Sequence, residues 1–373
     1  MSVKKQPAVS VIVPARNEEA CLATCLESLV AQTGIEFEVI VVDDASTDRT
    51  AEIARSFSRT HGAAGVLARP TFTVIAAPPL PENWTGKNNA MSAGAKIARG
   101  NWLLFTDADT FHKPGSLARA VAEAEEHGAA LLSYSPEQEV CTFWEKAVMP
   151  VIFAELAAAY PPAKVNDPTS PVAAANGQYL LISREAYVAV GGHTKIACDL
   201  LEDVAMARLV KSSGRKIFFR YGGDAVRTRM YRNWAQMKEG WTKNLALLFR
   251  HPTQLAQKKI AEFILPLVGF YGILDGLFWF RDSIPWVPHR WMRLYIVLGG
   301  ASVFTTVVVQ FAKRIRRANF SWSSLPRAYL GLPAFAYFLG RSARAYRKSQ
   351  FDWKDRTYTY DPKELETIVK NWC

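Results

Sequence analysis

Cysteine and histidine are scarce in this chain of 373 residues, with five of the former and six of the latter. The cysteines show none of the paired Cys-x-x-Cys spacing that binds zinc. Cys21 and Cys25 lie four residues apart on a predicted helix without a nearby histidine, so we expect them to be small packing residues. The first twenty residues also lack the apolar core of a secretory signal peptide. We therefore expect the N-terminal part of the chain to lie in the reducing cytosol.

No glycine-rich phosphate loop follows the first predicted strand. Residues 11–18 read Val-Ile-Val-Pro-Ala-Arg-Asn-Glu, and the lack of glycine excludes both a P-loop and a dinucleotide-binding fingerprint. Sequence motifs of nucleic-acid binding, such as a helix-turn-helix or a zinc finger, are missing too, so we expect no nucleic acid as a partner. Residues 313–373 hold 13 basic and 5 acidic side chains and account for most of the net charge of +11. A basic tail beside long apolar segments indicates an anionic membrane surface.

Apolar, β-branched runs alternate with helical patterns over the first 134 residues. Strands are expected at residues 8–13, 37–42, 74–76, 101–106 and 129–134, and helices at residues 17–31, 51–57 and 88–99. Ser46 and Asp48 are candidates for capping the second helix. This alternation predicts a parallel, doubly wound sheet with right-handed connections. From about residue 130, with the strand at 129–134, the pattern changes and continues with a helix at 143–160, a strand at 179–183, a helix at 201–213 and a strand at 216–221.

Two long apolar segments follow, at residues 260–280 and 291–311. Each is long enough to cross about 30 Å of hydrocarbon, and tryptophans lie near the ends as in an interfacial belt. A third segment, residues 325–340, contains two prolines and an arginine. A full crossing there would place the following arginines outside, against the positive-inside rule. We expect two true spans and a third segment that is interfacial or re-entrant, with a large buried helical core as the alternative.

Asp107 and Asp109 directly follow the apolar strand predicted at residues 101–106. The carboxyl end of a parallel strand is where open α/β sheets bind ligands. A pair of carboxylates suits Mg²⁺ or Mn²⁺ that carries phosphates. An acidic turn without a ligand is the alternative, because aspartate is common in turns. The rest of the chain favours a divalent metal site.

Other polar side chains follow neighbouring strand ends. Arg16, Asn17 and Glu18 could hold a base and a ribose, or could simply start a helix. The carboxylate of Asp44 could accept a hydrogen bond from the imide N–H of uracil. Lys87 precedes a helix, where an ammonium group suits a diphosphate, although a solvated lysine is the alternative. Since parallel strands end at one edge of a sheet, we expect these groups and the aspartate pair to line one crevice.

Several segments resemble the family 2 glycosyltransferases, which have the nucleotide-diphospho-sugar transferase (GT-A) fold. The segments are VIVPARNEE, VVDDASTDRT, WTGKNNA, FTDADT, NGQYLLISREAY and LEDVAMARLVKSSG. The resemblance implies a Rossmann-like mixed α/β sheet in a catalytic domain at residues 1–245. A membrane-associated region with transmembrane helices would follow at residues 246–373. This tail resembles that of a membrane-associated branch, which includes hopene-associated and carotenoid-acid glycosyltransferases.

The resemblance also implies roles for individual residues. Residues at the first two strand ends would bind the nucleoside, those further on the phosphates, and the aspartate pair a divalent metal, Mg²⁺ or Mn²⁺. The expected assignments are Pro14, Ala15, Arg16 and Glu18 beside the uridine, Asp44 on the base, Lys87 and Asp107 on the nucleotide sugar, and Asp109 with Asp107 on the metal.

Glu202 and Asp203 match the acidic pair of the family, in which the aspartate is the expected general base. An inverting transfer needs such a carboxylate to take the proton of an acceptor hydroxyl. A predicted helix start favours the ionised form of Asp203, although helix capping is the alternative role.

The Gln-x-x-Arg-Trp motif of processive members is missing, which favours a single transfer over polymerisation. Its approximate place is held by Arg229, Tyr231, Trp241 and Lys243, which are candidates for contacting the acceptor or the diphosphate. Lys243 could equally face the membrane.

Three further features stay open at this point. The apolar helix at residues 143–160 could rest on the bilayer and admit a lipid, or could pack in the core. His112 and His193 lie in predicted loops near the crevice. His112 could contact the metal or a phosphate, but we expect an exposed loop histidine.

Together these features predict a cytosol-facing enzyme at the inner cell membrane. It would transfer a sugar from a nucleotide-diphosphate sugar, by default a UDP-hexose, to a lipid acceptor. Acceptors of the terpenoid, hopanoid or carotenoid type are implied by the resemblance alone. A polyprenyl-phosphate sugar transferase is an alternative enzyme. A degenerate nucleotide-sugar-binding membrane protein is the non-enzymatic alternative.

Overall fold

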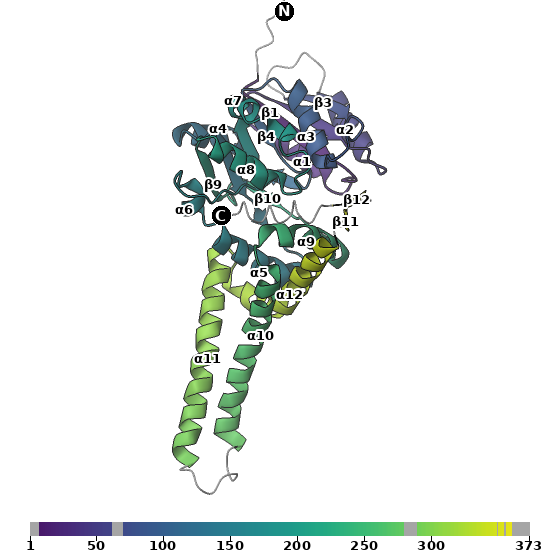
Figure 1. Cartoon of the computed structure of the whole chain (residues 1–373). Helices are drawn as coiled ribbons and strands as arrows, with labels where there is room; N and C mark the ends of the chain where they lie inside the picture. Colours follow the sequence, from purple (N-terminus) through teal and green to yellow (C-terminus); the bar gives the residue numbers. More distant parts are fainter. Residues whose placement is uncertain (1–6, 62–69, 280–288, 349, 354–355, 360–373) are drawn as a thin grey trace, which may run out of the picture. The chain divides into compact units, whose positions relative to one another are not determined.

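The computed structural model describes residues 7–61, 70–279, 289–348, 350–353 and 356–359 (Figure 1). The chain divides into two compact units. Of the described residues, the first unit holds those up to 139 together with 160–230, and the second holds 140–159 together with those from 231 to 359. The domain boundary expected near residue 245 stays a prediction.

A seven-stranded sheet forms the centre of the first unit, in the order β3-β2-β1-β4-β8-β6-β9. Strands β3, β2, β1 and β4 run parallel to one another. Strand β8 runs antiparallel to both of its neighbours, so the sheet is mixed rather than wholly parallel. This confirms the mixed α/β fold implied by the resemblance. The strands are Val9–Ala15 (β1), Phe37–Asp43 (β2), Thr71–Ala76 (β3), Trp102–Phe105 (β4), Leu131–Ser135 (β6), Leu180–Ser183 (β8) and Ile217–Tyr221 (β9).

Helices cover both faces of this sheet. On β1, Val11 is buried with the helices of one face, while its neighbour Ile12 is buried with those of the other, because successive side chains of a strand point to opposite sides. The first face is covered by Leu22–Val30 (α1), Thr50–His61 (α2) and Ser116–Glu126 (α4). The second is covered by Gly86–Ile97 (α3), Pro162–Asn166 (α6), Arg184–Ala189 (α7), the short turn Gly192–Thr194 (η1) and Glu202–Ser212 (α8).

A small three-stranded sheet supports the turn that follows β4. Its strands are Thr110–His112 (β5), Glu137–Gln138 (β7) and Val226–Thr228 (β10), in the order β5-β10-β7. The hydroxyl of Thr228 donates to the backbone oxygen of Asp109 at 3.2 Å. The small sheet therefore fixes the backbone of the predicted metal-binding turn.

The first helix starts later than the sequence predicts, at Leu22 instead of near residue 17. Asn17 adopts a left-handed backbone with φ of 53°, which asparagine tolerates better than most residues. Its N–H donates to Oγ of Ser46 at 3.1 Å, across to the loop that follows β2. The residues between β1 and α1 therefore form a loop that stays at the edge of the sheet.

The described part of the second unit is helical except for one hairpin. Its helices are Phe143–Ala159 (α5), Trp234–Leu248 (α9), Pro252–Leu274 (α10) with a π-helical turn Asp275–Trp279 (η2), His289–Arg317 (α11) and, after the short turn Trp322–Ser324 (η3), Leu325–Arg347 (α12). The hairpin pairs Gln350–Trp353 (β11) with Arg356–Thr359 (β12).

Helix α12 packs on α5, α9 and α10. Its approach to α5 requires glycine at position 331, because a Cβ there would collide with the backbone carbonyl of Ala147. Helix α5 is buried from Ala147 to Ile152. Of the two alternatives for this apolar helix, the structure therefore shows packing in a protein core.

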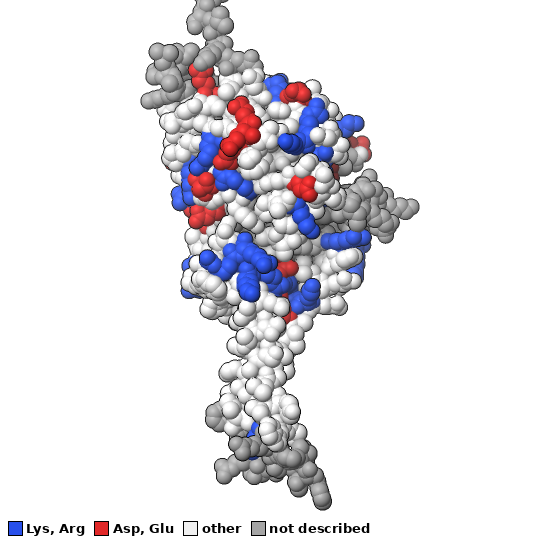
Figure 2. Space-filling model, turned by 90° about the vertical axis from the view of Figure 1, so that its left-hand side faces the viewer, with Lys and Arg blue, Asp and Glu red and all other residues white. Residues whose placement is uncertain are grey.

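Two helices of the described chain are long and apolar enough to cross a membrane, namely Pro252–Leu277 and Trp291–Arg317. Only 22% and 6% of the residues in their most apolar windows are buried, which is unlike the core helices of a soluble protein. On the face that Figure 2 shows, the surface of this helical pair is almost free of charged side chains between the rest of the protein and the grey residues. Membrane association is thus supported by length, composition and exposure.

Four charged side chains join α5, α10 and α11, and we call them the Lys259 cluster. The ammonium of Lys259, only 1% exposed, lies 2.6 Å from Glu155 and 2.8 Å from Glu262. Arg314 pairs with the same two glutamates. The two positive and two negative charges balance one another, as burial requires, because a lone buried charge is strongly destabilising.

Candidate active site

Three neighbouring strands end at the same edge of the main sheet. Strand β1 lies between β2 and β4 and runs parallel to both, so Ala15, Asp43 and Phe105 end close together. The polar residues singled out from the sequence follow these ends. The topology therefore brings the three loops to one edge, as the sequence predicts.

The loops after β1 and β2 are tied to each other. Arg16 donates to the backbone oxygens of Asp44 at 2.7 Å and Ala45 at 3.1 Å. The N–H of Glu18 donates to Oγ1 of Thr50 at 2.7 Å. Asp44 is only 7% exposed. These hydrogen bonds tie the two loops together at the sheet edge, beside Pro14 near the end of β1.

The two capping candidates for α2 take different roles. The Asp48 carboxylate accepts from the N–H of Thr50 at 3.0 Å, at the start of the helix. The hydroxyl of Ser46 accepts instead from the loop after β1. Of the two, Asp48 is the one that serves the helix start.

Lys87 lies in the first turn of α3, whose N-terminus is capped by the Thr85 hydroxyl. The next residue, Asn88, is buried and fixes the position of this turn. Its side-chain N–H₂ donates to the backbone oxygens of Ile196, Ala197 and Asp199 at 2.6, 3.1 and 2.9 Å. Those residues directly precede α8, so Asn88 brings the start of α3 beside the start of α8.

This contact places Lys87 among the predicted catalytic carboxylates. Its ammonium nitrogen lies 2.7 Å from Oδ1 of Asp107 and 2.6 Å from Oε1 of Glu202. Asp203 accepts a hydrogen bond of 2.8 Å from the N–H of Gly177. Four predicted residues from three distant parts of the sequence are thus brought together, and three of them, Lys87, Glu202 and Asp203, lie beside Gly177.

Gly177 lies in a crowded position. A Cβ there would lie 3.0 Å from Oε1 of Glu202, 3.1 Å from Nζ of Lys87 and 3.5 Å from Oδ2 of Asp203. Hydrogen bonds hold its loop on both sides, because Asn176 donates its N–H to Oγ of Ser133 at 2.8 Å and the backbone oxygen of Gln178 accepts from the Thr106 hydroxyl at 2.8 Å. Glycine therefore lets the backbone approach the charged groups closely and donate to Asp203.

The electrostatics of the cluster differ from one group to the next. Burial opposes the charged form of Lys87, but the Asp107 and Glu202 carboxylates outweigh it and hold the pKa of the ammonium well above its usual value. For Asp203, burial and the charge of Glu202 raise the pKa to about 6, against the smaller opposing effects of Lys87 and the backbone N–H groups. A carboxylate with such a pKa is basic enough to accept a proton near neutral pH.

The residues at the end of β4 fit a divalent metal that also binds phosphates. Asp107 and Asp109 present two carboxylates across Ala108, and Oδ1 of Asp109 is buried. In the described residues, no three His, Cys, Asp or Glu side chains are grouped to hold an ion by themselves. Two carboxylates with further ligands from a diphosphate are a usual arrangement for Mg²⁺.

The predicted acceptor-binding residues fall in both units. Arg229 belongs to the first unit, and Tyr231, Trp241 and Lys243 belong to the second. Tyr231 and Trp241 are 5% and 2% exposed and their rings pack edge to face, with centroids 5.7 Å apart. The backbone oxygen of Lys243 accepts from the Tyr346 hydroxyl at 2.6 Å. A role of these residues in binding stays a prediction.

The expectation of an exposed loop histidine at position 112 is wrong. His112 lies in β5, is 1% exposed, and its Nε2 is 3.2 Å from the Thr106 hydroxyl. Burial lowers its pKa to about 3, so it is neutral. His193 is also buried, bonds to the Tyr187 hydroxyl at 2.9 Å and packs against Phe105. Both histidines therefore support the sheet edge from within.

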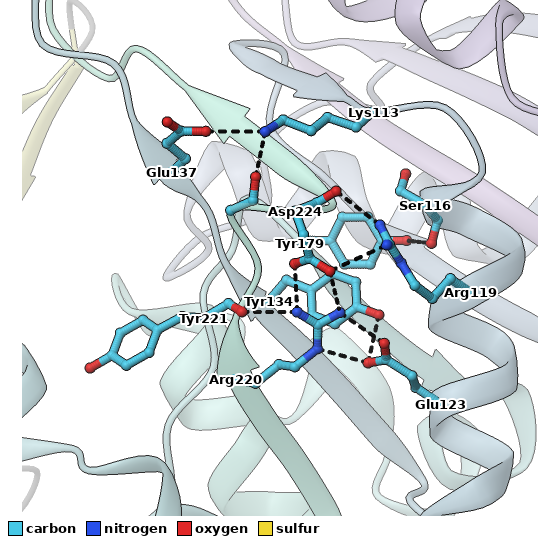
Figure 3. A network of polar contacts seen from close by, with 11 residues as sticks. Lys113, Ser116, Arg119, Glu123, Tyr134, Glu137, Tyr179, Arg220, Tyr221 and Asp224 are labelled. Carbon is cyan, nitrogen blue, oxygen red and sulfur yellow. Dashed lines mark hydrogen bonds and ion pairs between the residues drawn. The ribbon is translucent and has the colours of Figure 1, made fainter. Parts of the chain in front are cut away.

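A second ionic group of the first unit, the Arg220 network, is built differently (Figure 3). Arg220 of β9 makes two hydrogen bonds of 2.8 Å to Glu123 and one of 2.7 Å to Asp224. Its guanidinium also lies 4.2 Å from the centroid of the Tyr134 ring. Arg119 pairs with Asp224 at 3.2 Å. Cations and carboxylates pair here in balanced numbers.

Two residues of the site escaped the sequence analysis, namely Asn88 and Gly177. Asn88 has no local signal, because its partners lie more than a hundred residues away in the sequence. Gly177 stands between Asn176 and Gln178, a composition typical of turns, and could have been noted as a close-approach position.

Comparison with known proteins supports the family. Residues 10–187 match a family model described as Glycosyl transferase family 2. Over 366 residues the chain is 29% identical to a 4,4'-diaponeurosporenoate glycosyltransferase of Staphylococcus aureus strain USA300, a match that covers 96% of this chain and 90% of the relative. The protein of the same description from strain MRSA252 is 25% identical, with the same coverage. The similarity thus extends far beyond residue 187.

A solved structure with a similar fold is a mannosyltransferase from Pyrobaculum calidifontis in complex with GDP-Man and Mn²⁺. It matches with a TM-score of 0.51 at 17% sequence identity and covers 92% of this chain and 87% of that chain. At this identity the likeness concerns the fold, which is GT-A-like.

Proposed function

We propose that this chain, whose residues 10–187 match the model of glycosyl transferase family 2, transfers a hexose from a UDP-sugar to a membrane lipid with inversion at the anomeric carbon. The observation that carries the proposal is the group of Lys87, Asp107, Glu202 and Asp203 at the carboxyl edge of the sheet. It combines a cation for a diphosphate with a base of raised pKa. The reaction requires both, because the cation stabilises the departing diphosphate and the base takes the proton of the acceptor.

The donor would bind along the edge formed by the first three loops. Pro14, Ala15, Arg16 and Glu18 would border the uridine, where Arg16 already holds the backbone of the neighbouring loop. The Asp44 carboxylate would accept from the imide N–H of uracil, a donor that cytosine lacks. Buried carboxylates that bond a base edge discriminate well, since the wrong base leaves them unpaired.

The diphosphate would lie between Lys87 and the aspartate pair. Asp109, with Asp107, would hold Mg²⁺ or Mn²⁺, ions that suit carboxylate and phosphate oxygens. Such an ion would act as a Lewis acid that stabilises the negative charge of the departing diphosphate. The Lys87 ammonium would add a fixed positive charge on the same group.

Asp203 would act on the acceptor. As the acceptor oxygen forms its bond to the anomeric carbon, its proton passes to the Asp203 carboxylate and the bond to the diphosphate oxygen breaks. The N–H of Gly177 orients the carboxylate through its 2.8 Å hydrogen bond. Glu202, which faces Lys87, would help to keep the proton on Asp203 by its negative charge.

A lipid acceptor is supported by two independent observations. The two long helices Pro252–Leu277 and Trp291–Arg317 expose apolar side chains along most of their length. A relative similar over 96% of this chain is described as acting on 4,4'-diaponeurosporenoate, an apolar carotenoid acid. We therefore favour an acceptor of the terpenoid, hopanoid or carotenoid type.

The same relative favours a second candidate, transfer to an acidic acceptor. A carboxylate or a polyprenyl phosphate is already ionised at neutral pH, so it attacks without giving up a proton. In that case Asp203 would be dispensable for proton transfer. The raised pKa of Asp203 favours the hydroxyl acceptor, because an ionised nucleophile needs no base.

We further propose that the catalytic domain, residues 1–245, lies on the cytosolic side of the inner cell membrane. Residues Lys313, Arg314, Arg316 and Arg317 end helix α11, where the positive-inside rule prefers cations on the cytosolic side. The UDP-sugar, a cytosolic donor, would then reach the site directly.

The proposed function is tested by comparing lipid extracts of cells that express the wild-type protein or the Asp109→Ala variant. We expect the wild-type cells to accumulate a lipid heavier by one hexose, and the variant to lose at least about 99% of it, as expected when the metal-bound charge of a leaving group is lost. Mass spectrometry of the glycolipids is the measurement.

The exposed residue Glu126 of α4 provides the matched control. The Glu126→Ala variant also removes one carboxylate from the first unit and should keep the product at the wild-type level. A hexose-free lipid profile in wild-type cells, or an unchanged product in the Asp109→Ala variant, would contradict the proposal.

A further inference from the structure

Lys87 bridges two carboxylates that come from different elements. Its nitrogen lies 2.7 Å from Oδ1 of Asp107, which follows β4, and 2.6 Å from Oε1 of Glu202, which starts α8. The Lys87 side chain is 32% exposed and that of Asp107 29%, so ions from solvent can reach this pair. The Glu202 side chain is only 8% exposed. One of the two partners of the lysine is thus accessible and the other is enclosed.

We infer that Lys87 is a placeholder cation, which pairs with Asp107 and must leave it before a divalent ion can bind there. The inference rests on the donor site proposed above and deepens it. An ammonium and a divalent ion on one carboxylate repel each other, and the repulsion is strong where the protein excludes part of the water. Lys87 therefore lowers the affinity of Asp107 for a metal ion that comes without a nucleotide.

A nucleoside diphosphate removes this conflict. Its oxygens offer the ammonium new partners, and the long, flexible stem of lysine allows the exchange. The negative charge of the diphosphate then lies between the two cations. Nucleotide and metal ion should consequently bind with positive cooperativity, and by linkage each raises the affinity for the other by the same factor, usually about 5- to 150-fold.

The surrounding residues keep Lys87 beside Asp107, where it competes with a metal ion. Asn88 holds the start of α3 against the residues that precede α8, as its three hydrogen bonds show. Glycine at position 177 leaves room for the ammonium, since a Cβ there would lie 3.1 Å from the Lys87 nitrogen. If Lys87 were only a structural tie, its removal would leave metal binding unchanged or weaker. If Lys87 is a placeholder, its removal should instead strengthen metal binding.

The test titrates purified full-length protein in detergent with MnCl₂ and follows the electron paramagnetic resonance signal of free Mn²⁺, with and without UDP. Without UDP, we expect the Lys87→Met variant to bind Mn²⁺ about tenfold more tightly than the wild type, a factor within the usual range of such coupling. The gain in Mn²⁺ affinity on adding UDP should shrink in this variant. The Lys87→Arg variant keeps the charge and should bind free Mn²⁺ like the wild type.

Thermal unfolding without metal shows whether each variant is folded. Should Lys87→Met fail to fold, Lys87→Gln, which keeps a polar head group, takes its place with the same expectation. Equal or weaker Mn²⁺ binding by the folded variant overturns the inference, while UDP-dependent Mn²⁺ uptake by the wild type would leave the proposed donor site intact. No Mn²⁺ uptake by the wild type even with UDP overturns both.

Discussion

Two ionic groups of the first unit, the Arg220 network and the group around Lys87, use the same kinds of side chain but differ in their balance of charge. In the Arg220 network, two arginines face two carboxylates, and Arg220 lies against Glu123, Asp224 and the ring of Tyr134 (Figure 3). Around Lys87, one ammonium bridges Asp107 and Glu202, with a third carboxylate, Asp203, beside Glu202. The first group is balanced in charge, and the second gathers carboxylates in excess of the cation that bridges them.

The difference is visible in the pKa values. Hydrogen bonds from Arg220 lower the pKa of Asp224, and for Glu123 they outweigh the opposing effect of burial, so the pKa of that carboxyl is lowered too. Burial beside Glu202 instead raises the pKa of Asp203 to about 6. Balanced pairing makes charges inert and stabilising, whereas crowding of like charges keeps one of them ready to take a proton.

The largest expected effect is that of Asp203→Asn. With a hydroxyl acceptor, removing the base should lower kcat about 1000-fold, because positioned proton transfer contributes roughly a hundred- to ten-thousand-fold. UDP binding should stay within about threefold, since a carboxylate–amide exchange keeps the shape of the side chain. Steady-state kinetics and UDP titration of the purified protein give both quantities.

Glu123→Gln in the Arg220 network is the matched control, and it should keep turnover close to that of the wild type. If Asp203→Asn retained a tenth or more of the wild-type kcat, the hydroxyl acceptor would be wrong. An acidic acceptor, which needs no base, would then be the better assignment.

The pH dependence of kcat/KM should show the raised pKa of Asp203 in the free enzyme. The base works in its ionised form, so activity should be full well above pH 6 and fall about tenfold per pH unit below that value. The range from pH 5 to pH 7 extends about one unit to either side of the expected pKa. If kcat/KM of the fully folded protein stayed constant over this range, the role of Asp203 as the base would be contradicted.

The smallest effect on turnover is expected for Arg220→Met, which should act on stability alone. Loss of the hydrogen bonds to Glu123 and Asp224 should lower the free energy of unfolding by about 2 kcal/mol at pH 7, while kcat stays unchanged. Both carboxyl pKa values are lowered in the folded state. The contribution is therefore present above about pH 4, the ordinary range of these groups, and is lost as the pH falls through the lowered values.

Chemical denaturation of wild type and Arg220→Met at pH 7 and at acid pH measures this contribution. A difference in stability that persisted unchanged into strong acid would show that packing of the arginine on Tyr134 dominates its charge.

The sequence predicts those parts of the molecule whose causes are local. The apolar runs of β1, β2 and β4 and the aspartates after them are adjacent in the chain, so the strand ends and their carboxylates could be assigned together. The two apolar helices follow from hydropathy alone. The pairing of Glu202 with this edge came from family resemblance, since nothing local connects it with Lys87.

What the sequence could not give depends on long-range contacts. His112 was expected to be exposed, but the pairing of β5 with β10 and the ring of Tyr179, whose centroid lies 5.6 Å from that of His112, enclose it. The early start expected for α1 was wrong because Asn17 is held in a left-handed conformation by the loop after β2. Each partner lies elsewhere in the chain, and no periodicity of a single segment can signal it.

The Lys259 cluster has a consequence for producing the protein in parts. Glu155 lies in residues 140–159, a part of the second unit that interrupts the first unit along the chain, whereas its partners Lys259 and Arg314 come more than a hundred residues later. A fragment that stops near residue 245 would carry α5 without α10, α11 and α12, leaving an acidic group and a broad apolar face uncovered. Soluble expression of the enzymatic half alone is thus a poor route to this molecule, and detergent or lipid extraction of the whole chain is the better one.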